Sequence, residues 1–146
     1  MKNCILSLIL LFTATFSSHA QNSNQQDPVV LFSGNTIERN KVQEWANEVY
    51  LNCPEYINDE LIGIYHSEVM RLQLIQLENI ESIGNSIAFN DLTMKNKCNP
   101  DLIRDGHFDL ATFNPLKYHI GYTNSDIQYI RLPQTGIFIR VQPIQY

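Results

Sequence analysis

Three alternating runs in the C-terminal third constrain the fold of this chain more than any other feature. Apolar and polar side chains alternate through residues 117–122, 127–132 and 137–142, and short polar turns separate the runs. A period of two puts the apolar side chains of a strand on one face, and short turns favour antiparallel neighbours. The runs predict a three-stranded antiparallel meander. Arg131 and Arg140 would lie on its wet face, and the last strand would be a free sheet edge able to pair with a partner strand.

An amphipathic helix is expected earlier in the chain. Apolar residues recur at steps of three and four between Val42 and Tyr50, and Trp45 lies on this apolar face as a core residue. Asn35 and Glu38 form a pair that resembles a capping box at the helix start. We therefore expect an α+β fold, in which an N-terminal amphipathic helix packs on an antiparallel sheet that ends in the C-terminal meander.

The intervening segments carry weaker signals. Residues 28–32 are expected to form a short strand or extended arm, residues 70–77 a strand, and residues 95–106 a loop. The pattern leaves residues 61–67 open between helix and strand, and it leaves residues 78–90 open between a short helix and a loop.

The N-terminus has the layout of a cleavable secretory signal. Lys2 precedes an apolar run from Cys4 to Phe16, and Ser18 and Ala20 are the small residues that signal peptidase requires. The run is shorter than the roughly 20 apolar residues of a membrane helix. We expect residues 1–20 to be a signal peptide, with an uncleaved anchor as the alternative.

Cleavage would leave an exported protein, periplasmic or secreted. Residues 21–27 are polar and rich in amides and are expected to form a flexible lead-in, and residues 28–146 are expected to form one globular domain. The chain has a formal net charge of −5. This acidic balance argues against nucleic acid and against anionic membrane surfaces as partners. A protein or a small molecule is the expected partner, and no stable membrane span is expected after cleavage.

Cleavage would also change the cysteine count. The chain has three cysteines, and removal of Cys4 leaves Cys53 and Cys98. Paired thiols usually close in the oxidising compartments that exported domains enter. We expect a Cys53–Cys98 disulfide, for which loop-closure entropy gives about 4 kcal/mol of stabilisation. Two free buried thiols or half of a metal site are the alternatives.

Signals for catalysis or metal binding are sparse. Asp105, His107 and Asp109 form the densest polar cluster, but the calcium-loop pattern is missing and a solvated turn is the favoured interpretation. The chain has neither a Gly-x-Ser-x-Gly elbow nor a His-Glu-x-x-His motif. We therefore assign no catalytic residue, no metal ligand and no cofactor.

Two tyrosines are further candidate ligand-binding residues. Tyr118 and Tyr122 would share one face of the first meander strand. An exposed tyrosine stripe suits a sugar or protein partner, because tyrosine combines a flat apolar ring with a polar tip. A stripe that faces the core is the favoured alternative.

Two short stretches resemble known sequences. These are Lys-Asn-Lys-Cys-Asn-Pro at 95–100 and Phe-Asn-Pro-Leu-Lys-Tyr at 113–118. Together with the C-terminal hairpin they resemble small exported proteins of unassigned function that occur in Bacteroidota. The resemblance covers the last third to half of the chain. It implies a bacterial exported protein and provides no activity and no catalytic residue.

These observations favour a non-enzymatic binding or interaction module of the cell envelope. The alternative is a small envelope hydrolase or metal-dependent enzyme that uses Asp105, His107 and Asp109, together with His119.

Overall fold

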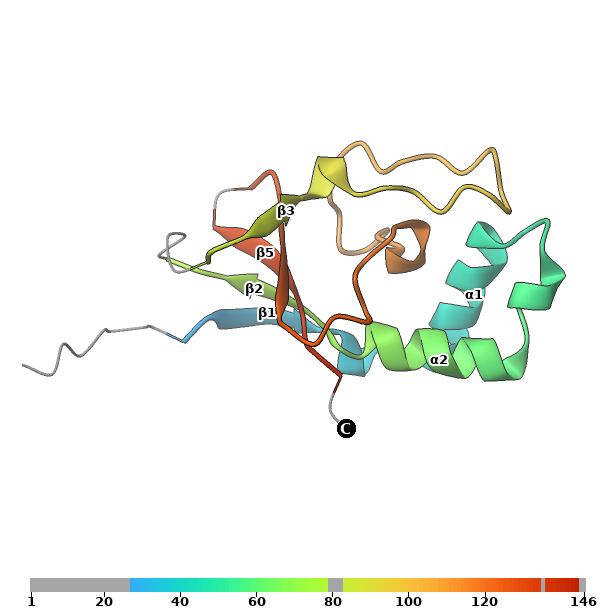
Figure 1. The fold of residues 1–146 in the computed structure, drawn as a ribbon, viewed down its shortest axis with the longest axis horizontal. Coiled ribbons are helices and arrows are strands. Elements are labelled where there is room, and N and C mark those ends of the chain that lie inside the picture. The colour runs from blue at the N-terminus through green and yellow to red at the C-terminus, as the bar shows by residue number, and fades with distance from the viewer. Residues whose placement is uncertain (1–26, 79–82, 135, 145–146) are drawn as a thin grey trace, which may run out of the picture.

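The computed structural model describes residues 27–78, 83–134 and 136–144 and contains helices together with a five-stranded sheet (Figure 1). The strand order is β1-β2-β5-β4-β3. Neighbouring strands are antiparallel except β3 and β4, which are parallel. The expected α+β class is confirmed, whereas the sheet is mixed and not wholly antiparallel. The strands are β1 (Val29–Ser33), β2 (Leu72–Gln76), β3 (Ser86–Ala88), β4 (Gln128–Arg131) and β5 (Ile137–Val141).

Two helices lie beside one end of the sheet (Figure 1). They are α1 (Arg39–Val49) and α2 (Asp59–Val69). Helix α1 occupies most of the range that the apolar periodicity indicates. The expected capping pair is wrong, because Asn35 lies in a preceding 3-10 turn and Glu38 is the N-cap without a side-chain hydrogen bond. The chain reaches α1 only after this extra turn, so the helix begins at Arg39, further along than a cap at Asn35 indicates.

The buried side chains form two clusters. One lies on the sheet and includes Leu74, Ile130 and Ile139. The other joins the two helices and includes Val42 and Ile62. Helix α1 therefore packs mainly on α2 and on the 3-10 turn Pro115–Lys117, and not mainly on the sheet as expected.

The predicted meander is only partly present. Its second and third strands are β4 and β5, which pair as an antiparallel hairpin. The first run, residues 117–122, is not a strand of the sheet. The amide of Ile120 donates to the carbonyl of Tyr118, and the amide of Tyr122 donates to that of Ile120. These tight turns use two of the donors that a strand ladder would need.

The position of the last strand also differs from the expectation. Strand β5 lies between β2 and β4, so it is central in the sheet and is not a free edge. The edge strands are β1 and β3. The expectation of an edge position came from the fact that β5 is the last alternating run in the chain. Instead, β2 pairs with β5 along its whole length, and β1 lies beyond β2 as the edge strand on that side.

Residues 86–88, expected in a short helix or loop, form strand β3, whose pairing with the distant β4 leaves no local periodicity; residues 79–82 lie outside the described residues. Residues 61–67 belong to α2, and β2 lies within the strand predicted at 70–77. The 28–32 segment corresponds to β1, and residues 95–106 contain no helix or strand. The signal peptide and nearly all of the lead-in lie outside the described residues. Within the residues that are described, no helix is both long and apolar enough to span a membrane.

Candidate functional site: an apolar pocket beside Trp45

The polar cluster predicted from the sequence does not converge on a common centre. Asp105 is mostly buried and accepts a 2.7 Å hydrogen bond from the Tyr118 hydroxyl. His107 and Asp109 are exposed, as is His119. The Asp109 carboxylate instead accepts a hydrogen bond from the Ala111 amide and so stabilises a turn. Among the described residues, no group of three His, Cys, Asp or Glu side chains is placed to hold a metal ion.

Asp105 belongs to a polar clamp that ties the long loop, residues 92–117, to α1. The Lys117 ammonium lies 3.2 Å from the Asp105 carboxylate and 3.0 Å from that of Glu48 on α1. Burial alone lowers the pKa of Lys117, but hydrogen bonds to Glu48 and Asp105 outweigh it and raise the pKa. For the Tyr118 hydroxyl, whose charged form is the anion, burial raises the pKa to about 12. Lysine therefore stays charged and tyrosine neutral, which suits a structural clamp and not a base or nucleophile.

The two tyrosines do not form an exposed stripe. Tyr118 is 0% exposed and Tyr122 is 4% exposed, and both belong to the sheet cluster. An exposed binding stripe is therefore wrong for both tyrosines, and the favoured alternative, a stripe that faces the core, is confirmed. The ring of Tyr118 packs beside Phe89, with 5.4 Å between the ring centroids.

An apolar pocket lies where the sheet, α1 and the long loop meet. It encloses a cavity of about 70 Å³. Leu72 and Leu74 of β2 and Ile139 of β5 line it from the sheet. These residues lie on the same face of the sheet because Leu74 pairs with Ile139, and Leu72 is two residues from Leu74. Period-two alternation in β2 and β5 thus builds one side of the pocket.

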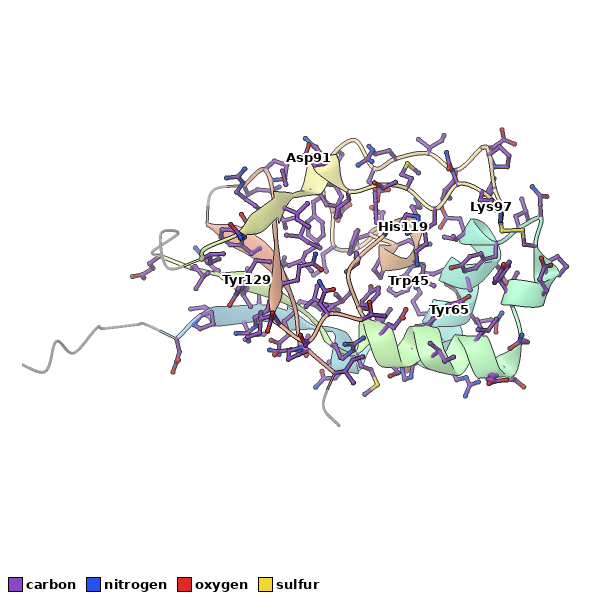
Figure 2. All side chains as sticks on the ribbon, in the orientation of Figure 1. Trp45, Tyr65, Asp91, Lys97, His119 and Tyr129 are labelled. Atoms are coloured by element: carbon purple, nitrogen blue, oxygen red, sulfur yellow. A yellow bond between two sulfur atoms is a disulfide. The ribbon has the colours of Figure 1, made fainter. Side chains whose placement is uncertain are left out.

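Four aromatic side chains also line the pocket. They are Phe32 of β1, Trp45 of α1, and Phe108 and Phe113 of the long loop. Phe108 packs tilted on Phe113, with 5.0 Å between centroids. Trp45 is half-buried and not fully within the core, and it lies between the helices and the sheet (Figure 2). Leu110, which is 41% exposed, lies where the lining meets solvent.

Among the residues that the structure describes, none with an ionisable side chain lines the pocket. Its only polar residue is Gln73, whose side-chain oxygen already accepts hydrogen bonds from Arg140 and Gln142. A charged ligand group would lose its hydration there without gaining a partner, whereas an apolar group would gain about 25 cal/mol for each Å² buried. A water occupies roughly 30 Å³ of liquid. The pocket therefore has room for a short alkyl group or part of an apolar side chain.

The sequence analysis missed this pocket. It singled out His107 and Asp109, but the residue that matters for the pocket is Phe108 between them. The position of Trp45 on the apolar face of α1 predicts a core residue, but its side chain lines the pocket and is half-buried. A signal was present in the alternation of Leu72 and Leu74, but nothing local indicates which segments cover that face.

Comparisons with known proteins give no relative for this chain. No protein-family model, no curated protein and no solved structure matches it.

Proposed function

We propose that this protein is a small exported binding module of the cell envelope, whose pocket holds an uncharged apolar group of its ligand. The observation that carries the proposal is the lining itself. Four aromatic rings and several aliphatic side chains surround a partly open cavity without one ionisable group. Apolar pockets of this kind are the usual sites of small-ligand binding.

The lining also favours binding over catalysis. Acid–base or nucleophilic chemistry requires a Ser, Cys, His, Lys, Asp or Glu side chain within reach of the reacting atoms. None of these residue types lines the pocket. The alternative, a hydrolase or metal-dependent enzyme built on Asp105, His107 and Asp109, has less support, because Asp105 is held by Tyr118 while the other two side chains are exposed.

Two observations support export. The N-terminal pattern is that of a secretory signal. Cys53 and Cys98 form a disulfide, as expected, with 5.4 Å between their Cα atoms. Stable disulfides are typical of proteins that leave the reducing cytosol. Both features fit a periplasmic or secreted protein, and the resemblance to exported Bacteroidota proteins points to the same compartments.

Trp45 provides a direct test of the pocket. It is the only tryptophan of the chain and it lines the cavity, so its fluorescence reports on occupancy. Titration with 1-hexanol, an uncharged alkyl probe, is expected to give a saturable blue shift. The Leu110→Glu variant puts a carboxylate at the pocket's edge and should weaken the affinity about tenfold, or ~1.4 kcal/mol.

The matched control is Leu51→Glu, at a position that is 64% exposed and does not line the pocket. This variant should bind hexanol like the wild type. A fluorescence response that rises linearly without saturation, or an equal loss in both variants, would contradict the proposal.

A further inference from the structure

Strand β1 is an uncharged apolar edge. It pairs with β2 on one side and forms one end of the sheet (Figure 1). Three consecutive side chains are exposed: Val29 by 57%, Val30 by 46% and Leu31 by 47%. Proteins often protect edge strands with charged residues. β1 (Val29–Ser33) has none, and its one irregularity is the bulge between Val30 and Phe32. A partner strand would cover this apolar edge.

The edge and the pocket are continuous. Phe32 belongs to β1 and also lines the pocket. The other lining strands are β2 and β5, whereas β4 and β3 contribute no lining residue. The pocket therefore lies over the half of the sheet that ends at β1. A strand added beside β1 would run next to the pocket.

We infer that the ligand is an extended, uncharged peptide segment that pairs with β1 as a sixth strand and places one apolar side chain in the pocket. This inference rests on the proposed function. In strand addition, main-chain hydrogen bonds provide affinity and pockets for alternate side chains provide specificity. Because neither β1 nor the pocket lining carries a charge, an uncharged aliphatic segment is the complementary partner.

One self-pairing of β1, the two-fold register centred on Leu31, fits this edge poorly. Val30 pairs with Ile75 and Phe32 pairs with Leu74, so a bulge separates the two pairs. Ile75 and Leu74 are adjacent and point to opposite sides, and therefore Val30 and Phe32 do so as well. A two-fold pairing centred on Leu31 would set Val30 opposite Phe32 of the other copy. Paired residues share a side of a sheet, so this self-pairing conflicts with the bulge.

The test uses an N-acetylated, C-amidated six-residue peptide in which threonine alternates with leucine. The peptide should shift Trp45 fluorescence in a saturable way and slow amide exchange in β1. Leu31→Lys places a charge on the exposed edge and should weaken peptide binding at least tenfold while leaving hexanol binding unchanged. The control Ile103→Lys adds the same charge at a position that is 79% exposed and outside the pocket, and it should change neither.

The possible outcomes separate the two proposals. Hexanol binding without peptide binding, or peptide binding that Leu31→Lys does not weaken, overturns the strand-addition inference and leaves the proposed function standing. If the wild type binds neither hexanol nor the peptide, both the proposed function and the strand-addition inference are overturned. A wild-type dimer that Leu31→Lys converts to a monomer in analytical ultracentrifugation also overturns the inference, because the edge would then be occupied by a second copy.

Discussion

At the scale of single residues, Gly34 allows the end of β1 to pack closely against the segment that connects α2 to β2. It is buried and follows β1 directly. A Cβ atom at this position would collide with the carbonyl oxygen of Val69, at the end of α2, and would lie 3.1 Å from that of Leu72. The absence of a side chain lets the β1 end approach the point where α2 leads into β2. Glycine is required here for close backbone approach.

We predict that Gly34→Ala lowers the free energy of unfolding by about 1–3 kcal/mol, because backbone atoms must shift to admit the methyl group. Urea denaturation measures this change. Gly63→Ala is the matched control, since Gly63 lies within α2 and a methyl group there would meet nothing within 4 Å beyond the helix's own backbone. Alanine favours a helix interior over glycine, so this variant should gain up to about 1 kcal/mol. Equal losses in both variants would contradict the role assigned to Gly34.

At the scale of elements, a set of cross-links holds the long loop against α1. The Cys53–Cys98 disulfide joins the segment after α1 to the start of the loop. Next to it, the Asn99 amide group donates a 2.8 Å hydrogen bond to the Glu48 carbonyl. The Lys117 clamp attaches the end of the loop to the Glu48 carboxylate. The loop can therefore carry Phe108 and Phe113 to the pocket although it contains no α-helix or strand.

The double variant Cys53→Ala/Cys98→Ala should lose about 4 kcal/mol of stability, because the open loop regains entropy in the unfolded chain. Chemical denaturation under non-reducing conditions measures the loss. A reductant should destabilise the wild type by a similar amount and leave the double variant unchanged. A double variant that unfolds at the wild-type denaturant concentration would show that the cross-link is dispensable.

Most of the individual helices and strands could be predicted from the sequence, whereas their arrangement could not. Periodicity located α1, β2, β4 and β5, because apolar residues recur at a regular step through most of each element. It failed for residues 117–122, whose alternating pattern comes from burial among loops and not from a strand ladder. The strand order and the pocket depend on contacts between distant segments. The sequence pattern of β5 does not record that β2 and β4 flank it.

At the scale of the whole molecule, the pocket lies between the two clusters of buried side chains. Val69 of the helix cluster and Leu72 of the sheet cluster both line it. Such junctions between packed layers are common places for binding sites. In the proposed binding module, the pocket would form within one chain, and β1 beside it would receive the partner strand.

The exported form is expected to begin at Gln21. Signal peptidase requires a small residue at the position before the cut, and Ala20 supplies it. Intact mass spectrometry of the protein recovered from periplasm or medium should give the mass of residues 21–146, less the hydrogens lost in the disulfide. Ala20→Lys removes the small residue and should leave the uncleaved chain in the membrane fraction, whereas Ala14→Leu, within the apolar run, should still be processed. A wild-type product that retains residues 1–20 would show that the segment anchors the protein, and the pocket would then act at the membrane surface.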